Sequence, residues 1–218
     1  MVRGMQARGV AGLRLIGGHA ALDLVNTIGA RRGRIGGDYL ATYDDLLLWA
    51  SRQGLLAEAE ASTLRAMAQA DPAGSDAALE RLKRLRECIW RIWTSMSDGG
   101  ATDLADLGLL TDEVAVAQQA RTLAWTGTGC EWRWTEAAGF DAVTARVALA
   151  AAELLVGQHL HRVRGCEGRN CGWLFLDTTR NSTRRWCSAE ECGSLARVTR
   201  FRAKRKTKKD GMPAAPKQ

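Results

Sequence analysis

The spacing of hydrophobic residues along the chain predicts a mainly helical protein. Apolar residues recur at steps of three and four over residues 19–28, 42–54, 57–70, 75–96 and 140–159, and more weakly over 102–120. This is the spacing of one buried helix face. Thr42 and the two aspartates that follow it suit a helix start, and Gly54 suits a helix end. We expect Pro72 and Gly74 to break the chain, so that the longest helix begins at Ser75.

Other segments follow the two-residue period of β-strands. Residues 13–16 predict a short strand, and residues 123–135 predict a β-hairpin that turns at 126–129. We expect its three tryptophans, Trp125, Trp132 and Trp134, to cover one face of the helical core. A second hairpin is predicted within residues 173–186. The predicted fold class is therefore mainly α with some antiparallel sheet (α+β).

Composition divides the chain into a body and a small C-terminal unit. We expect disorder at residues 1–12, which are rich in Gly and Arg, and in the tail at 207–218. Residues 13–160 form the predicted helical body, and residues 161–206 form a separate small unit. No stretch approaches the 18 apolar residues of a membrane span, and the N-terminus lacks the apolar core of a signal peptide. We therefore expect a cytoplasmic protein with no membrane partner.

The net charge of +7 is unevenly distributed along the chain. Residues 1–159 hold 16 Arg or Lys against 19 Asp or Glu, whereas residues 160–209 hold 14 against 4. Clustered cations bind a phosphate backbone strongly because binding releases condensed counterions. The basic end therefore favours nucleic acid as a partner, although a solubilising tail would have the same composition.

Four of the six cysteines form two short-spaced pairs in this basic region. Four residues separate Cys166 from Cys171, four separate Cys187 from Cys192, and fifteen lie between the pairs. This layout is typical of a tetrahedral zinc site with four thiolate ligands. Such a site leaves no coordination position open, so we expect one structural Zn²⁺ and no catalysis by the metal. An iron–sulfur cluster also uses four thiolates and stays open as an alternative.

The metal is expected to order the C-terminal unit and the helix that ends it. A unit this small has too little core to fold unaided, so metal binding would supply much of its folding free energy. Ser188 and Glu191 resemble a capping box that would start a helix near Cys192. We expect that helix to dock through Leu195, Val198 and Phe201. The candidate nucleic-acid contacts are Arg180, Asn181, Arg184, Arg185, Arg197, Arg200 and Lys204.

These motifs resemble those of a known family. Residues 171–177 (CGWLFLD), 180–181 (RN), 184–188 (RRWCS) and 192–193 (CG) resemble the bacterial CGNR-type zinc finger. Residues 17–27 (GGHAALDLVNT) are similar to the opening of the ABATE domain, which usually precedes this finger. The resemblance covers nearly the whole chain and implies a stress-induced transcriptional regulator that binds DNA through the finger.

One departure from the family pattern concerns DNA contact. Ser194 and Leu195 stand where the motif that names the finger has Asn and Arg. The four cysteines are unaffected, but any contact made by that arginine is missing from this chain. Arg197 and Arg200 are candidates to replace it.

The body offers a candidate site for a small effector. Asp23, Asn26 and Thr27 are polar residues in an otherwise apolar segment, and Arg31 follows in an arginine-rich loop. Such groups can orient a ligand in a pocket, or they can cap a helix and brace a turn, and the sequence leaves both interpretations open.

The leading functional hypothesis is a zinc-dependent DNA-binding regulator, a role with which a homodimer is compatible. The alternative is a zinc-stabilised RNA-binding or protein-interaction module. We do not expect an enzyme, because none of the three histidines is paired with a clear nucleophile or second carboxylate.

Overall fold

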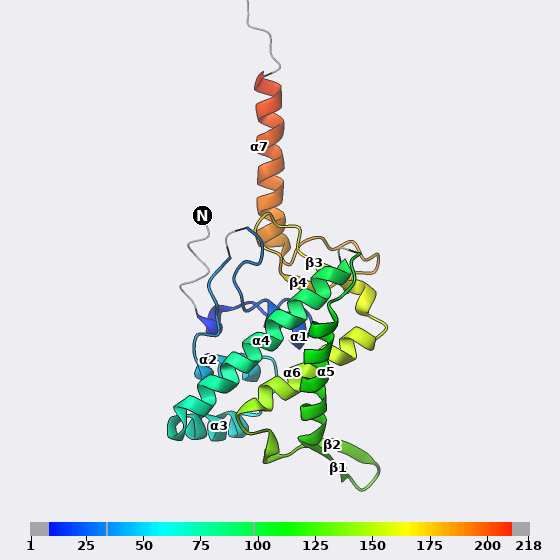
Figure 1. Cartoon of the computed structure of the whole chain (residues 1–218). Helices are drawn as coiled ribbons and strands as arrows, with labels where there is room; N and C mark the ends of the chain where they lie inside the picture. The colour runs from blue at the N-terminus through cyan, green and yellow to red at the C-terminus, as the bar shows by residue number, and fades with distance from the viewer. Residues whose placement is uncertain (1–8, 34, 98, 211–218) are drawn as a thin grey trace, which may run out of the picture.

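The computed structural model describes residues 9–33, 35–97 and 99–210, so the predicted disorder at 1–8 and 211–218 lies outside the described residues. Helices α1 to α6 form a bundle crossed by the long helix α4, with a small two-stranded sheet at each end (Figure 1). Helix α7 extends away from the bundle at the end that carries the second sheet (Figure 1). The predicted mainly α fold with small antiparallel sheets is confirmed.

Polar caps fix the first two helices. α1 (Ala20–Val25) begins at His19, whose Nδ1 accepts a backbone N–H of the first turn at 3.3 Å. Burial lowers the pKa of His19, which keeps this nitrogen available as an acceptor. α2 (Tyr43–Arg52) begins at Thr42 as predicted, with a reciprocal capping box between Thr42 and Asp45.

The next two helices follow one another with a single residue between them. α3 (Glu58–Ala70) and α4 (Pro72–Ser97) are separate helices, as predicted, but the break lies at Asp71 and α4 begins at Pro72, not at Ser75. Pro72 is the first residue of α4, where its missing N–H costs no helical hydrogen bond. Asp71 accepts the Gly74 N–H at 2.9 Å and stabilises this start.

The predicted apolar stripe of α4 forms the centre of the bundle. The residues Leu79, Leu82, Leu85, Ile89 and Trp93 are at most 3% exposed. α5 (Leu104–Gln119) and α6 (Ala142–Val156) pack against α4 and against each other.

A β-hairpin connects α5 to α6 and projects from the end of the bundle (Figure 1). β1 (Arg121–Trp125) pairs antiparallel with β2 (Cys130–Trp134), as predicted. Its tryptophans do not cover the core, however, because Trp125 and Trp132 are 70% and 54% exposed and only Trp134 packs on the bundle. Alternation along a strand identifies an apolar face but not what that face contacts.

The segment predicted as the first strand is extended but pairs with no strand of the described residues. Arg52 donates to the carbonyls of Val10 and Leu13, and Arg184 donates to the carbonyl of Ile16. Arginine side chains thus occupy acceptors that a neighbouring strand would use. Val10 is only 2% exposed and lies in a 3-10 turn, so ordered structure begins before Leu13.

The C-terminal sheet differs from the predicted one. β3 (Val163–Gly165) pairs antiparallel with β4 (Leu174–Leu176), so the hairpin spans the first cysteine pair and does not lie within residues 173–186. The second half of that range forms a loop. α7 (Ser194–Asp210) runs past residue 207, where a disordered tail was predicted.

The body and the C-terminal unit share one hydrophobic core. Trp173, Leu174 and Phe175 are buried in the same cluster as Leu22 and Leu24 of α1. α1 packs directly on β4. The C-terminal unit, predicted as a separate part of the chain, therefore packs its apolar strand against the helical body.

Candidate metal centre and basic helix

Four cysteines lie together where β3, β4 and the start of α7 meet. Their Sγ atoms all lie within 4.8 Å of one another, and the Sγ of Cys187 is 3.6 Å from those of Cys171 and Cys192. Zn–S bonds of roughly 2.3 Å in a tetrahedron place the sulfur atoms roughly 3.8 Å apart. Both the donor set and the spacing therefore fit one zinc ion.

The hairpin turn positions the first cysteine pair. The Cys166 N–H donates to the Trp173 carbonyl at 2.7 Å and closes the turn that contains Cys171. Gly168 belongs to the turn between Cys166 and Cys171 and faces the second pair, so that a Cβ at this position would be 3.0 Å from the Sγ of Cys192. The close approach of the pairs therefore requires a glycine here.

A capped helix start positions the second pair. The Ser188 Oγ accepts the Glu191 N–H at 3.2 Å and begins the π-helical turn Ala189–Gly193, which contains Cys192 and continues into α7. The predicted helix start at Ser188 is confirmed. A ligand bound by Cys192 would consequently fix the first turn of the basic helix.

Contacts among the four thiols shift their pKa values in opposite directions. Hydrogen bonds from the neighbouring thiols, Cys171 foremost, lower the pKa of Cys166. The same contact with Cys166 raises the pKa of Cys171 and that of Cys187, because each is held as a hydrogen-bond donor. The pKa of Cys192 is lowered as well. The state with four thiolates requires a cation among them.

Asn26 joins the body to the strand beside this cluster. Its Nδ2 donates to the Leu174 carbonyl at 2.8 Å, and its Oδ1 accepts the Leu174 N–H at 2.9 Å. The Trp173 indole donates to the Ile28 carbonyl at 2.7 Å, and the Arg31 N–H donates to the Cys171 carbonyl at 2.7 Å. The fully buried Asn26 amide therefore completes the backbone hydrogen bonding of β4 in the way a neighbouring strand would.

Asp23 and Thr27 are also buried and bonded within the protein. Asp23 accepts the Gly17 N–H at 2.8 Å, and burial raises the pKa of its carboxyl group above the ordinary value. Thr27 donates to the Leu24 carbonyl at 2.7 Å and accepts from Arg86 at 2.9 Å. Their polar atoms thus brace α1 and the loop that follows it.

A charge network of two buried arginines and two partly exposed carboxylates, which the sequence did not predict, supports the same loop. Arg86 binds the Asp38 carboxylate through two nitrogens at 2.8 and 2.7 Å and donates to Glu87 at 3.0 Å. Glu87 in turn accepts from Arg31 at 2.5 Å. Arg86 lies among the buried positions of α4, four residues after Leu82. A charged residue in the apolar stripe was the sequence signal that could have predicted a buried ion pair.

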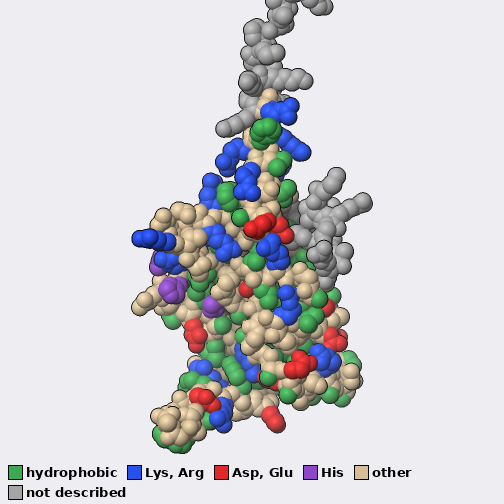
Figure 2. Space-filling model, turned by 180° about the vertical axis from the view of Figure 1, so that it is seen from behind, with side chains coloured by type: hydrophobic (Ala, Val, Ile, Leu, Met, Phe, Trp, Pro, Cys, Tyr) green, Lys and Arg blue, Asp and Glu red, His purple; other side chains and the backbone are tan. Residues whose placement is uncertain are grey.

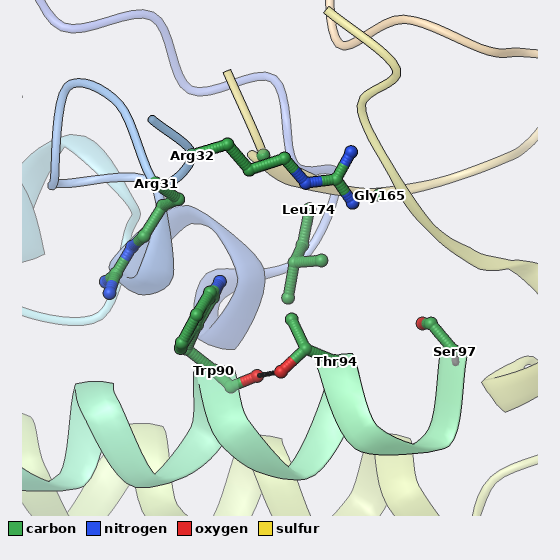
Figure 3. A pocket seen from close by; sticks show the side chains of 8 residues that line it. Arg31, Arg32, Trp90, Thr94, Ser97, Gly165 and Leu174 are labelled. Carbon is green, nitrogen blue, oxygen red and sulfur yellow. Dashed lines mark hydrogen bonds between the residues drawn. The ribbon is translucent and has the colours of Figure 1, made fainter. Parts of the chain in front are cut away.

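A cavity of about 280 Å³ lies between α4 and the C-terminal unit (Figure 3). Its lining comes from three parts of the chain: Trp90, Thr94 and Ser97 of α4, Arg31 and Arg32 of the loop after α1, and Gly165, Gly172 and Leu174 beside the cysteines. The Arg32 guanidinium extends toward Gly165, whereas that of Arg31 points the other way (Figure 3). Of the four residues predicted to bind an effector, Arg31 lines this cavity, and Asp23, Asn26 and Thr27 do not.

The cavity wall is bonded to the cysteine cluster. Arg32 Nη1 donates to the Cys166 carbonyl at 3.3 Å. The Arg31 guanidinium is held by the Val25 carbonyl and Glu87, and it lies 5.4 Å from the Trp90 ring. Arg32 is exposed and is therefore the cation of this wall that a ligand can reach.

Arg184 is turned into the protein. Its guanidinium donates to the carbonyls of Cys187, Ile16 and Trp186 at 2.6, 3.1 and 3.1 Å. It also lies 4.2 Å from the Phe175 ring. This arginine fastens the loop between the cysteine pairs to the body.

The other predicted nucleic-acid contacts lie at the surface. Arg180 and Asn181 are exposed in the loop between the cysteine pairs. Arg185 is exposed as well, and its Nε lies 2.9 Å from the Glu167 carboxylate. Arg197 and Arg200 are exposed on α7, with Arg197 donating to the Ala189 carbonyl at 3.3 Å.

Basic side chains surround α7 where it leaves the body (Figure 2). The predicted docking of this helix through an apolar stripe was wrong, because Leu195, Val198 and Phe201 are 68%, 43% and 62% exposed. The side chain of Lys204 lies outside the described part of the chain. The described portion of α7 therefore presents both arginines and apolar side chains to solvent.

Two family models match adjacent parts of the chain. Residues 18–158 match the ABATE family, described as "Putative stress-induced transcription regulator", and residues 162–205 match the CGNR zinc finger. Neither description is that of an enzyme. A search among curated proteins gave no match. No helix within the described residues is long and apolar enough to cross a membrane.

Proposed function

The chain belongs to the ABATE family and carries a CGNR zinc finger, and from this premise we propose that it is a zinc-dependent transcription regulator that binds DNA through its C-terminal end. Cys166, Cys171, Cys187 and Cys192 hold one structural Zn²⁺. A zinc ion with four thiolate ligands supplies folding free energy and no open coordination position. The cysteines therefore order the start of α7 and take no part in catalysis.

The position and charge of α7 carry this proposal. Eight of its 17 residues are Arg or Lys and one is acidic. Like charges this close repel one another along a helix, and a helix without packing partners is marginal in water. Phosphates relieve that repulsion, and an α-helix fits the major groove of duplex DNA. DNA thus supplies the opposite charges and the packing surface that α7 lacks in the free protein.

The basic residues divide between contact and support. Arg197 and Arg200 bind DNA phosphates or base edges, with Arg180 and Asn181 as a second contact beside the cluster. Lys204 joins the first group on the strength of its sequence position. Because Arg185 already faces Glu167, it exchanges a carboxylate for a phosphate on binding.

Arg184 has a positioning role in this proposal. Its guanidinium is committed to backbone carbonyls of the loop and the N-terminal segment. It therefore holds the loop that presents Arg180 and does not itself reach DNA.

The cavity beside the cluster supports a sensing role for the body. Arg32 can pair with the carboxylate of a small ligand, and the 280 Å³ volume limits that ligand to about the size of benzoate. Arg31 lines the cavity, while Asp23, Asn26 and Thr27 keep its walls in place. Benzoate is a suitable probe: we expect it to raise the melting temperature of the protein but not that of an Arg32→Gln variant. Equal shifts for both proteins would contradict a site at Arg32.

The test of DNA binding compares two matched arginine replacements. We expect Arg197→Gln with Arg200→Gln to weaken duplex binding in fluorescence anisotropy and to flatten the plot of log affinity against log salt by about 2, since each phosphate contact contributes about 0.9. Arg65→Gln on α3, a half-buried arginine at the other end of the bundle, should leave both values unchanged.

Three other results would contradict all or part of the proposal. An unchanged salt slope in the double variant would remove these two arginines from the interface. Tighter binding to single-stranded or duplex RNA than to DNA would favour an RNA-binding module. No binding to either nucleic acid at low salt would favour a protein-interaction module.

A further inference from the structure

The β1–β2 hairpin has one apolar face and one polar face. In its register Leu123 lies opposite Trp132 and Trp125 lies opposite Cys130, and cross-strand partners share a face of a sheet. The apolar face therefore carries all four of these side chains. The other face carries Glu131 and Arg133, which form an ion pair at 2.7 Å.

Most of the apolar face is exposed to solvent. Leu123, Trp125 and Trp132 are 58%, 70% and 54% exposed. The hairpin stands clear of the helical bundle (Figure 1), and only its base is anchored, through Trp134 against Ala117 and Leu149. An isolated two-stranded hairpin is marginally stable in water, and exposed apolar patches commonly mark contact surfaces.

A groove adjoins the apolar face at its base. The groove has a volume of about 430 Å³ and is lined by apolar residues together with three charged ones: Gly54, Leu55, Trp134, Leu149 and Ala150, and Arg121, Arg146 and Glu153. Arg121 and Trp134 are cross-strand partners in the same register, on the same side as Trp132. The exposed tip and the groove therefore belong to one continuous surface.

We propose that this surface joins two copies of the chain, with the hairpin tip of each copy seated against the groove of the other. A two-fold interface requires one patch that is complementary to itself, and a projecting tip beside a groove meets that requirement.

The charge of the surface favours a second copy over a charged partner. Within the described residues, the charged side chains of this surface are Arg121, Arg146 and Glu153, all of which line the groove. Arg121 lies 4.3 Å from the Trp132 ring, and Arg146 lies 4.6 Å from the Trp134 ring. The apolar face of the tip itself carries no charge, so an acidic or basic partner has nothing to pair with there, and two copies meet no repulsion along the strands.

The exposed area of the tryptophans gives the approximate size of the contact between two copies. An indole side chain offers at most about 250 Å², so the exposed fractions leave roughly 300 Å² of tryptophan surface per copy. Two copies bury twice this area together with the leucines and groove walls, which brings the contact near the lower limit of about 1,200 Å² for stable interfaces. We therefore expect a weak, reversible dimer that forms without DNA.

Sedimentation equilibrium of the zinc-loaded full chain, without DNA, tests the proposal. We expect a monomer–dimer equilibrium whose dissociation constant rises at least tenfold in a Trp125→Ser/Trp132→Ser variant. Leu104→Ser is the matched control. Leu104 is 80% exposed and is the first residue of α5, at the opposite end of that helix from the hairpin. Circular dichroism of both variants establishes that the helical bundle is retained.

Alkylation of Cys130 gives a second measurement in the unmodified protein. Cys130 is exposed in the single chain, so its rate of reaction with a maleimide should fall as the protein concentration rises. A monomer at every concentration, with a constant rate, would overturn the proposal. So would a dimer weakened equally by the Leu104 replacement or unaffected by the tryptophan replacements.

Discussion

Asn26→Ala removes the hydrogen bonds that join the helical body to β4. The amide of Asn26 makes two bonds to the backbone of Leu174, and both residues are at most 1% exposed. Alanine leaves a buried N–H and a buried C=O without partners, and each such group costs about 1–3 kcal/mol. The free energy of unfolding should therefore fall by about 2–6 kcal/mol, a large fraction of the about 5–15 kcal/mol typical of a folded domain.

Urea unfolding of the zinc-loaded protein, followed by circular dichroism, measures this loss. Asn181→Ala is the control, because Asn181 is an exposed asparagine of the C-terminal unit and its replacement should change stability by less than about 0.5 kcal/mol. The Asn26 variant should also lose zinc faster to a chromogenic chelator, since β4 flanks the cysteine cluster. An Asn26 variant as stable as the Asn181 variant would refute a structural role for this amide and return it to the candidates for ligand binding.

Three further outcomes are expected. Cys192→Ser should abolish stoichiometric zinc binding in metal analysis and, because the core is shared, should lower the unfolding midpoint of the whole chain; full zinc occupancy would contradict the ligand assignment. Arg184→Ala should lower the unfolding midpoint and leave the salt slope of DNA binding unchanged, whereas Arg200→Ala should do the reverse; a flattened slope for Arg184→Ala would place its guanidinium at DNA. Burial raises the pKa of Cys88 to about 11, so at pH 8 about one thiol in a thousand is ionised and iodoacetamide should modify the exposed Cys130 but not Cys88; rapid labelling of Cys88 in peptide mass spectrometry would contradict its burial.

The fold could be predicted from the sequence wherever the signal was local. The Thr42 cap and the apolar stripe of α4 depend on neighbours within one or two turns, and both occur as predicted. The partner of β4 could not be assigned in this way, because pairing of strands depends on contacts between distant residues. The same limit applies to the hairpin, whose alternating residues indicate an apolar face while Trp125 remains exposed.

The candidate site shows the same division between local and distant signals. The spacing of the cysteines was sufficient to predict their cluster, because two short-spaced pairs separated by a short loop are the usual layout of a four-cysteine zinc site. The polar residues of the 17–27 segment stood out in the sequence, but their role could not be assigned there, because the partner of Asn26 is Leu174, far along the chain. Charge alone could not distinguish the inward-facing Arg184 from the exposed Arg200.

The most direct test of the account is duplex DNA binding by the zinc-loaded protein over a salt series, repeated after the metal is removed by a chelator. The proposed cationic contacts are Arg180, Arg185, Arg197, Arg200 and Lys204. About five phosphate contacts predict a slope of log affinity against log salt of about −4.5. The account predicts binding with a slope of this order that is lost with the metal and restored when zinc is returned. Equal affinity and slope in the metal-free protein would contradict the claim that the cysteine cluster organises the DNA-binding helix.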